Sequence, residues 1–565
     1  MSSRAPALPS HLARAIASWT AEDPDPQTRQ QVSDLLAAAE AGEGSAVAEL
    51  VDAFSGRLQF GTAGLRGQLG PGPNRMNRVI VGQAAAALAT YLLDHGLAGG
   101  KVIIGFDARR NSDIFARDTA EIIAAAGFEA MITPGPLPTP VVAFGIRHLG
   151  CVAGVVVTAS HNPPQDNGYK VYLGDGSQIV PPADAAISSR IDEVAKHRLD
   201  DVPRSQSYAV LDAALVDDYV DRIASWVPRD APRQLRWVYT PLHGVGGSLV
   251  ERVVEACGFP PGNVVAEQAE PDSRFPTVAF PNPEEPGAID LALAMAQRID
   301  ADLVIANDPD ADRLAAAIVV DGQWRMLRGD ELGALLGDDA LRRGVHGTYA
   351  CSIVSSSMLA AMAAAHGQPF AYTLTGFKWI GRVPGLAYGY EEAIGYCVDP
   401  DAVSDKDGIS ALARLLMLAA GLKAEGRGIL DRLEEIARRY GVYETDQMSL
   451  RVEHIEIITA AMARLRANPP KTLGGQPTSV VDLAHGTDEL PASDAVLIDG
   501  QTIKVVVRPS GTEPKLKCYL EARQPLTDPD DLATARAAAL STLAVIRSEM
   551  SAILGLTASD GPEAP

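Results

Sequence analysis

Short apolar runs alternate along the chain with Ala-rich stretches whose apolar positions follow a helical period. The run at 101–107 (KVIIGFD) is followed by a helical stretch at 116–128, and the run at 235–240 by one at 247–259. The strand-like pattern returns at 301–308 (ADLVIAND). This alternation predicts sheets, at least partly parallel, that are covered by helices.

The C-terminal part of the chain has a different pattern. Residues 495–522 are typical of a strand, an Asp-Gly turn, a second strand, a loop and a third strand. Such a sequence predicts an antiparallel arrangement. A helix over 529–554 would pack on it, which makes this last part an α+β domain.

Polar or Pro-rich stretches at 197–212 and 321–330, and the end of a long helix near 443–450, suggest where domains meet. The fold class expected is therefore α/β, with three mixed α/β domains and a C-terminal α+β domain. The expected domains are 1–205 with a helical N-terminal extension, 206–325, 326–447, and 448–565 with a disordered tail.

The composition limits which partners the chain can have. It has 565 residues, 47% hydrophobic and 21% charged, with a net charge of −22. This charge argues against a nucleic-acid or anionic-membrane surface. An anionic small molecule would need arginines and lysines placed locally in its site.

The five cysteines and the termini indicate a cytoplasmic protein. The cysteines are scattered, odd in number and without a CxxC pair, as expected for reduced thiols. The N-terminus has no sustained apolar core, so we expect no signal peptide. The most apolar stretch, 411–422, is short and contains Arg414, so we expect a core helix and no membrane span.

Three aspartates follow the apolar run at 301–306. Asp308, Asp310 and Asp312 stand at alternate positions and repel one another unless a positive charge neutralises them. Oxygen ligands in a tight loop suit a hard divalent cation, Mg²⁺ above all. An EF-hand fails on spacing, because its turn glycine would fall at Arg313. A solvated acidic loop is the alternative.

A candidate phosphate cradle lies between two predicted strands, in the segment 505–517 (VVVRPSGTEPKLK). An arginine fork, two hydroxyls and a glycine that lets backbone N–H groups turn inward suit a phosphate. The residues concerned are Arg508, Ser510, Gly511 and Thr512. The segment is not a Walker A loop, since no GK[ST] follows. An ordinary hairpin remains the alternative.

Three further residues or pairs are weaker candidates. Arg66 is the strong donor within the Gly-rich segment 60–70. Lys378 could meet a phosphate, and the paired carboxylates Glu391 and Glu392 could accept hydrogen bonds from sugar hydroxyls. The alternative for the pair is a charged helix start.

The segment 155–172 (VVVTASHNPPQDNGYKVY) presents Ser160 at the end of an apolar strand. It lacks the G-x-S-x-G pattern of a serine hydrolase. On an extended backbone, the side chain of His161 points away from Ser160. A turn at Asn167–Gly168 would bring Lys170 back toward the serine. A serine, a lysine, a metal site and a phosphate cradle together favour phosphoryl transfer.

The order of four motifs resembles the α-D-phosphohexomutase superfamily. These motifs are TASHNPPQDNGYKVY, NDPDADR, GYEEAIGY and RPSGTEPK. FGTAGLRG, TGFKWIG and PNPEEPGA (281–288) resemble the branch that holds eukaryotic phosphopentomutases and bacterial phosphoglucomutase/phosphomannomutase proteins. The resemblance extends over roughly residues 50 to 525, and the ordered set of motifs makes it specific.

The resemblance implies a four-domain architecture around a central cleft and a role for each motif. Ser160 would be the phosphoserine and, with the three aspartates, a metal ligand. Lys170, His161 and Arg66 would surround the transferring phosphoryl group, with Lys170 the candidate general acid/base. Arg313, Lys378, Glu391 and Glu392 would bind substrate, and Arg508, Ser510, Gly511 and Thr512 the phosphate that does not react.

The implied function is a phosphosugar mutase that works through a bisphosphorylated sugar. Phosphoglucomutase/phosphomannomutase activity is the first expectation, and phosphopentomutase or a metal-dependent sugar phosphatase are the alternatives. A catalytically dead structural or binding protein is the rival from another class. Mg²⁺ and glucose 1,6-bisphosphate, or an equivalent bisphosphate, are the expected cofactor and activator. A monomer or homodimer is expected.

One motif departs from the family pattern. Many members read G-E-x-S at the sugar loop, whereas this chain has Tyr390, Glu391, Glu392 and Ala393 there. The missing serine hydroxyl leaves the sugar open among glucose, mannose and pentose phosphates.

Overall fold

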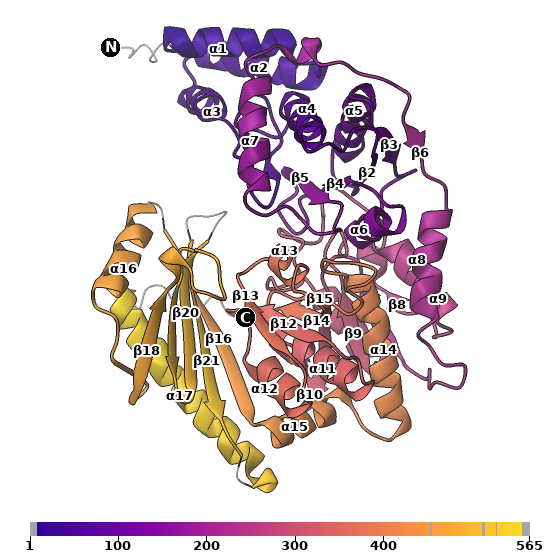
Figure 1. The fold of residues 1–565 in the computed structure, drawn as a ribbon, viewed down its shortest axis with the longest axis vertical. Coiled ribbons are helices and arrows are strands. Elements are labelled where there is room, and N and C mark those ends of the chain that lie inside the picture. The colour runs from indigo at the N-terminus through magenta and orange to yellow at the C-terminus, as the bar shows by residue number, and fades with distance from the viewer. Residues whose placement is uncertain (1–7, 453–454, 511–514, 527, 556–565) are drawn as a thin grey trace. The chain divides into compact units, whose positions relative to one another are not determined.

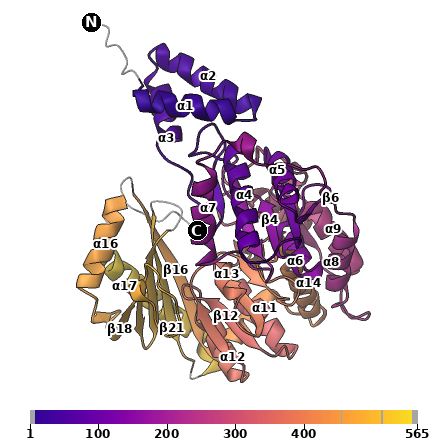
Figure 2. The ribbon, with the colours of Figure 1, turned by 45° about the horizontal axis from the view of Figure 1, so that its top comes forward.

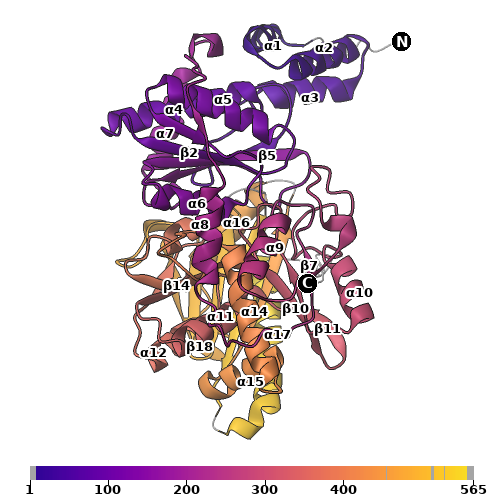
Figure 3. The ribbon, with the colours of Figure 1, turned by 90° about the vertical axis from the view of Figure 1, so that its right-hand side faces the viewer.

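The computed structural model describes residues 8–452, 455–510, 515–526 and 528–555. The chain divides into two compact units. The first contains residues 1–231, 236–314 and 401–413, and the second contains 232–235, 315–400 and 414–565. The ribbon is shown in Figures 1, 2 and 3.

The first sheet of the first unit has the strand order β1-β5-β4-β2-β3-β6. Strands β4, β2, β3 and β6 run parallel, while β5 is antiparallel to both β4 and β1. The strands are β1 (Leu65–Gln68), β2 (Lys101–Phe106), β3 (Glu129–Ile132), β4 (Ala153–Val157), β5 (Asp166–Leu173) and β6 (Ala209–Val210).

Helices cover both faces of this sheet. Figure 3 shows α4, α5 and α7 on one side of it and α6 on the other. They are α4 (Arg78–Asp94), α5 (Ser112–Ala125), α6 (Thr139–His148) and α7 (Ala183–Val194). Because both faces are covered, β4 is buried at every position and its sequence AGVVV is apolar throughout.

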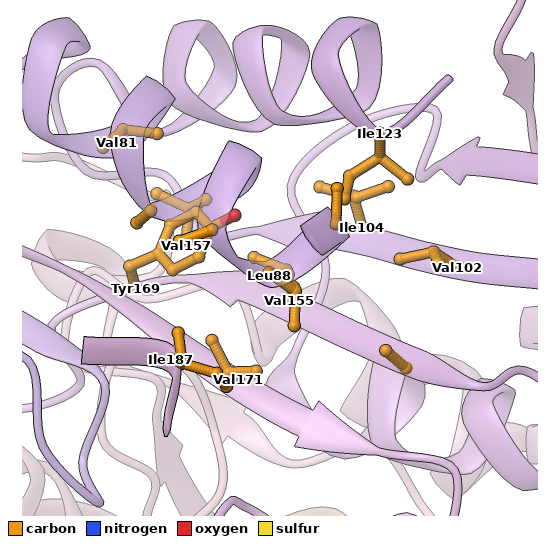
Figure 4. Close-up of a cluster of buried hydrophobic side chains, with 14 of the residues drawn as sticks. Val81, Leu88, Val102, Ile104, Ile123, Val155, Val157, Tyr169, Val171 and Ile187 are labelled. Carbon is orange, nitrogen blue, oxygen red and sulfur yellow. The ribbon is translucent and has the colours of Figure 1, made fainter. Parts of the chain in front are cut away.

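The core of this part lies between the sheet and the helices α4, α5 and α7. Figure 4 shows Ile123 of α5 next to Ile104 of β2, and Leu88 of α4 next to Val155 of β4. The side chain of Asn77 accepts a hydrogen bond from the Ile80 amide and so caps the start of α4. This core holds β4 and β5 in place, and with them the turn that carries Ser160.

The predicted helical N-terminal extension is confirmed. It contains α1 (Ser10–Glu22), α2 (Pro26–Glu40) and α3 (Gly44–Phe54), which are visible in Figure 2. Trp19 stacks edge-on against Phe54, with ring centroids 5.7 Å apart. These helices bury their apolar faces against Val79 and Leu199.

Three further parallel strands of the first unit run in the order β8-β7-β9. They are β7 (Trp237–Thr240), β8 (Asn263–Val264) and β9 (Leu303–Ala306). The helices beside them are α8 (Ala214–Ala224), α9 (Gly247–Ala256) and α10 (Asp290–Ile299). The acidic motif follows β9 directly, at the carboxyl end of a buried parallel strand.

The second unit begins with the antiparallel hairpin β10 (Ala315–Val320) and β11 (Gln323–Met326). Its next sheet has the order β13-β12-β14-β15, with β12 parallel to β13 and β14. The strands are β12 (Thr348–Ser352), β13 (Phe370–Thr373), β14 (Leu386–Glu391) and β15 (Gly395–Cys397). The helices of this part are α11 (Gly329–Arg342), α12 (Met358–Ala365), α13 (Phe377–Ile380) and α15 (Ile429–Tyr440), together with residues 414–424 of α14 (Gly408–Ala424).

The last sheet is antiparallel throughout, as predicted, in the order β16-β21-β20-β19-β18-β17. The strands are β16 (Val442–Arg451), β17 (Thr472–Leu473), β18 (Gln476–Asp482), β19 (Val496–Gly500), β20 (Ile503–Pro509) and β21 (Lys515–Gln524). Figure 1 shows α17 (Leu532–Leu554) along this sheet, together with α16 (Ile455–Ala467).

By length and composition, α17 is the one helix among the described residues that could cross a membrane. One face of α17 packs against the last sheet and contributes to its hydrophobic core, as a helix of a folded domain does. The residues of this face are Leu532, Ala535, Ala539, Leu543, Ile546, Met550 and Leu554.

The expected fold class is confirmed, with helix-covered mixed sheets first and an antiparallel α+β sheet last. The domain boundaries themselves stay predictions. Strand β16 crosses the last of them, at 447–448, and pairs along its whole length with β21.

Candidate active site

Ser160 lies in the turn that joins β4 to β5. Its backbone is left-handed, with φ 52°, and its amide donates a hydrogen bond to Thr158 Oγ1 at 2.9 Å. This conformation is uncommon for a residue with a side chain and is often found at functional sites. The Ser160 side chain is buried at the carboxyl end of β4, where α/β sheets bind their ligands.

The turn predicted at Asn167–Gly168 is wrong, because both residues lie inside β5. The chain reverses earlier, before Asp166, and β5 then runs antiparallel to β4. A Cβ on Gly168 would lie 2.5 Å from the Thr158 carbonyl oxygen, so the close approach of the neighbouring strand requires glycine there. Lys170 still reaches the site, from the middle of β5.

The three aspartates after β9 are buried and gathered together. One carboxylate oxygen from each lies within 4.8 Å of the others. The Arg313 amide donates to Asp308 Oδ1 at 3.0 Å, and the Thr139 hydroxyl donates to Asp310 Oδ2 at 2.6 Å. The aspartates therefore form a preformed cluster, and the alternative of a solvated acidic loop is wrong.

The same cluster contacts Ser160 and Lys170. The Ser160 hydroxyl donates to Asp308 Oδ2 at 2.7 Å. The Lys170 ammonium donates to Asp310 Oδ2 at 2.7 Å and to Asp312 Oδ2 at 2.8 Å. The structure thus joins two motifs that lie about 140 residues apart in the sequence.

These contacts set the protonation states. Burial, and then the charges of Asp310 and Asp312, raise the pKa of Asp308 well above its usual range. Burial opposes ionisation of Asp312 as well, but Lys170 and Lys406 outweigh it and lower the pKa of this carboxyl. Burial lowers the pKa of Lys170, and the two carboxylates more than reverse this, so Lys170 is a cation at neutral pH.

The cluster fits a divalent metal ion. Asp310 Oδ1 and Asp312 Oδ1 are buried and have no hydrogen-bond partner among the described residues. Buried carboxylate oxygens left without a donor are costly unless a cation binds them. An oxygen-only donor set suits Mg²⁺ or another hard cation.

His161, Arg66 and Arg313 surround the same region. His161 Nδ1 lies 3.1 Å from Ser160 Oγ, so the expectation that its side chain points away is wrong. The left-handed Ser160 breaks the extended backbone on which that expectation depended. Burial, and then Arg313 and Arg66, lower the pKa of His161 well below its usual range, so its ring is neutral. Arg66 Nη1 donates to Asn162 Oδ1 at 3.2 Å.

The other predicted residues lie in the second unit. Glu391 ends β14 and is buried, and Glu392 Oε2 accepts hydrogen bonds from the Ser352 and Ser355 hydroxyls at 3.1 and 3.2 Å. Burial, and then Glu391 and Asp330, raise the pKa of Glu392 to about 7. The pair lies at a strand end, and the alternative of a helix start is wrong.

The candidate phosphate cradle begins at the end of β20. Arg508 lies within β20, and the Ser510 amide donates to the Lys515 carbonyl at 2.7 Å, which closes the loop between β20 and β21. Gly511 and Thr512 lie outside the described residues. Lys378 lies in α13, half-buried, two residues after Gly376, whose φ is 106°.

The charges of Glu392 and Arg508 both act on the Tyr519 hydroxyl. Burial, and then Glu392, raise the pKa of Tyr519, whereas Arg508 lowers it. Glu392 and Arg508 therefore act on a common neighbour within the second unit.

Four family models match the chain in order. They describe the phosphoglucomutase/phosphomannomutase alpha/beta/alpha domains I, II and III and the C-terminal domain. The matched residues are 57–198, 217–321, 328–440 and 450–538. Together they cover well over half of the chain.

The chain belongs to the phosphoglucomutase/phosphomannomutase family.

Individual relatives agree with this. A probable phosphomannomutase of Haemophilus influenzae is 47% identical over 466 residues, which cover 81% of this chain and 94% of the relative. The phosphopentomutase of Homo sapiens is 36% identical and covers 92% of this chain and 93% of its own length. A crystal structure of a phosphoglucomutase/phosphomannomutase family protein from Burkholderia thailandensis has a TM-score of 0.68 at 22% identity. It covers 87% of this chain and 97% of that one, and shares the fold.

Sequence reasoning missed a second lysine of the acidic cluster in this family member. Lys406 Nζ lies 3.4 Å from Asp312 Oδ2 and 3.6 Å from Asp405 Oδ1. Asp405 is held in turn by the Tyr172 hydroxyl at 2.8 Å and by Gln178 Nε2 at 2.7 Å. The available signal was a basic residue inside the acidic segment 404–408 (SDKDG).

A second omission was Arg109, which lies beneath the Ser160 turn. Its guanidinium donates to four backbone carbonyls of that turn, at distances between 2.6 and 3.1 Å. The acceptors are the carbonyls of Ser160, Asn162, Pro163 and Asp166. The sequence feature that could have revealed Arg109 is the segment FDARR at the end of β2, because a basic residue at a strand end is a candidate for binding a ligand or positioning a loop.

Proposed function

We propose that this chain is a phosphosugar mutase in which Ser160 carries the phosphoryl group. The observation that carries the proposal is the Ser160 hydroxyl, 2.7 Å from Asp308, within a buried cluster of three aspartates and Lys170. A hydrolase triad would need a base oriented by a third group, whereas this site is built for charge neutralisation.

In the first half of the reaction, a hydroxyl oxygen of the sugar phosphate attacks the phosphorus of phosphoserine 160. The bond between phosphorus and Ser160 Oγ breaks and a bisphosphorylated sugar forms. Ser160 Oγ takes one proton from a donor as that bond breaks, and the proton that the sugar hydroxyl loses returns to the same donor, so no net proton is taken up or released. We assign the donation to Lys170, because Asp310 and Asp312 keep it protonated.

His161 and Arg66 are assigned to the transferring phosphoryl group. His161 is neutral, so its ring can donate one hydrogen bond from one nitrogen and accept one at the other. Arg66 offers a fork of donors that matches phosphate oxygens. Asp308, Asp310 and Asp312, with Ser160, would hold Mg²⁺, which when bound neutralises charge on the phosphoryl oxygens.

In the second half, the bisphosphorylated sugar turns round and its other phosphate is returned to Ser160. The phosphate that does not react therefore needs a site of its own, which we assign to Arg508, Ser510, Gly511 and Thr512. Glu391 and Glu392 would accept hydrogen bonds from the sugar hydroxyls, with Lys378 and Arg313 as further substrate contacts. Water must be excluded while phosphoserine is present, or it would be hydrolysed.

A hexose phosphate is the first candidate substrate, as a glucose or mannose phosphate. The 47% identity to a probable phosphomannomutase supports this choice. A pentose phosphate is the second, because the human phosphopentomutase is similar over 92% of this chain. Glucose 1,6-bisphosphate or its equivalent would phosphorylate Ser160 and so act as the activator, and we place the enzyme in the cytoplasm.

The test is a coupled assay with glucose 1-phosphate, mannose 1-phosphate and ribose 1-phosphate, each with glucose 1,6-bisphosphate and with or without Mg²⁺. We expect isomerisation without net phosphate release, and a phosphorylated peptide containing Ser160 in the mass spectrum. Ser160→Ala should abolish both, while Ser189→Ala, at an exposed position of α7, should change neither. Mutase activity in Ser160→Ala near that of the wild type would refute the mechanism, and net phosphate release would favour the phosphatase.

A further inference from the structure

The turn between β12 and α12, residues 352–357, holds Glu392 by hydrogen bonds. We call it the serine turn, because four of its six residues are serines. The Ser352 and Ser355 hydroxyls donate to Glu392 Oε2 at 3.1 and 3.2 Å, and the Glu392 amide donates to Ser355 Oγ at 3.1 Å. The position of the serine turn thus determines where Glu392, and Glu391 beside it, can lie.

The other side of the serine turn is held by two charged residues of the last sheet. Lys504 Nζ donates to the Ser355 carbonyl at 2.5 Å, and the Ser357 amide donates to Glu521 Oε2 at 2.6 Å. Lys504 and Glu521 are direct cross-strand partners on β20 and β21. Both are buried, with 7% and 2% of their surface exposed, which is rare for such residues unless they are paired.

The alternation of side chains along β20 explains why these charges face the serine turn. Val505 and Val507 point into the core beneath α17. Lys504, Val506 and Arg508 point the opposite way, since side chains alternate along a strand. Val506 and Tyr519, its cross-strand partner, pack against the serine-turn residues Ile353 and Val354.

Lys504 and Arg508, the arginine of the predicted phosphate cradle, therefore lie on the same face of β20. Lys504 and Arg508 are four residues apart, which is about 13 Å at 3.3 Å per residue. A sugar phosphate that reaches from the carboxylates at 391–392 to the cradle must fit the spacing between them. That spacing is fixed on one side by the serine turn and on the other by β20.

We propose that Lys504 and Glu521 are positioning residues that fix the spacing between the Glu391–Glu392 pair and the phosphate cradle at Arg508. They touch no substrate and act through the serine turn. The inference rests on the proposed function and deepens it: the spacing selects the sugar by the distance between its hydroxyls and its distal phosphate. A hexose phosphate and the shorter pentose phosphate differ in that distance.

The test uses the full chain with Lys504→Met, with Glu521→Gln and with both. Steady-state kinetics are measured with glucose 1-phosphate and ribose 1-phosphate, and hydrogen exchange is followed in the peptide that contains the serine turn. The matched controls are Lys471→Met and Glu456→Gln, at exposed positions of the same domain.

We expect each single variant to raise KM at least about 10-fold, because Lys504→Met removes the hydrogen bond to the Ser355 carbonyl and Glu521→Gln replaces a charged acceptor of the Ser357 amide with a neutral one. The ratio of kcat/KM for the two sugars should change at least about threefold, and exchange in the serine turn should become faster. The double variant should lose less than the product of the two single losses, as expected for coupled residues. The controls should behave as the wild type.

The proposal is overturned if the single variants keep the wild-type KM, sugar ratio and serine-turn exchange. A fall in kcat alone, equal for both sugars, would also overturn it, because it would indicate a general structural effect. If Lys504→Met does not fold, the near-isosteric Glu521→Gln carries the same test. An inactive wild type with intact exchange protection would refute the proposed mutase function instead.

Discussion

The arginine beneath the Ser160 turn gives a sharp prediction. Arg109→Met keeps the length of the side chain but removes the guanidinium that donates to four carbonyls of the turn. It also leaves Asp107 without the cation 3.4 Å from it, and both side chains are buried. The variant therefore tests what positions Ser160.

The magnitude follows from these contacts. A hydrogen bond from a charged donor contributes about 1.5–3 kcal/mol, and breaking a buried ion pair costs about 3–5 kcal/mol. The losses overlap, and carbonyls of the turn can reach water if the turn moves. We therefore expect the free energy of unfolding to fall by about 3 kcal/mol, toward the lower end of the buried-pair range.

The larger effect should be on catalysis. Without Arg109, the carbonyls of the turn can form hydrogen bonds with water only if the turn moves, and this movement displaces Ser160. A displacement of about 1 Å at a reacting group costs about 10²-fold in rate. We expect kcat/KM to fall at least that much, and Ser160 to be phosphorylated more slowly by the bisphosphate. Kinetics, mass spectrometry of the Ser160 peptide and urea unfolding measure these effects.

The neighbouring Arg110 supplies the control. Its side chain is exposed, and the contact of this residue to Asn167 is made by its backbone carbonyl, which Arg110→Met retains. Arg110→Met should therefore keep activity and stability close to those of the wild type. The reasoning is refuted if Arg109→Met loses stability as calculated and yet keeps kcat/KM within about threefold, since positioning should cost far more.

Two more predictions concern ionisable groups. Mg²⁺ should raise the melting temperature of the wild type, and Asp310→Asn should abolish this rise because it removes one charge of the cluster; an undiminished Mg²⁺ effect in the variant would contradict the assigned ligands. The pKa of Glu392 rises from 4.5 to about 7 on folding. Between these two pH values, the folded state therefore holds a proton that the unfolded state has lost. Stability should therefore fall as pH rises from 4.5 to 7, by at most about 3 kcal/mol. Glu392→Gln should lack this fall in urea unfolding at about pH 5 and about pH 7.5, and an unchanged slope would contradict the shift.

The sequence located the reacting groups because they lie in contiguous motifs at strand ends. Ser160 follows the apolar run of β4, and the aspartates follow that of β9, so each could be placed at the carboxyl end of its strand. The pattern of apolar residues also predicted the change from parallel sheets to the antiparallel last sheet. Local patterns of this kind need no knowledge of distant partners.

Predictions failed where the same residues serve two structural purposes. Asn-Gly is typical of a hairpin turn, but Gly168 is required because two carbonyls approach it closely, that of Leu65 in β1 and that of Thr158 just after β4. The Asn167 side chain donates to the Ser112 hydroxyl at 3.0 Å and to the Arg110 carbonyl. A sequence does not distinguish a turn glycine from one required by neighbouring strands.

The other contacts that could not be predicted join residues that are far apart in the sequence. Lys406 lies 94 positions after Asp312 in the sequence, yet its ammonium is 3.4 Å from that carboxylate. It is placed by the hydrogen bonds of Asp405 to Tyr172 and Gln178, which belong to another part of the chain. Nothing in the local pattern at 404–408 gives that distance.

The charges around Ser160 explain how so acidic a chain can hold an anionic substrate. Cations lie beside the carboxyl groups near Ser160 although the chain carries −22: Lys170 contacts Asp310 and Asp312, and Lys406 lies near both Asp312 and Asp405. Arg66 and Arg313 add two further positive charges near Asp312. A phosphoserine adds a charge of about −1.5 to −2. A divalent cation held by Asp308, Asp310 and Asp312 would offset this charge. Phosphate and metal should therefore stabilise each other in this site, because in a buried cluster either charge alone is costly.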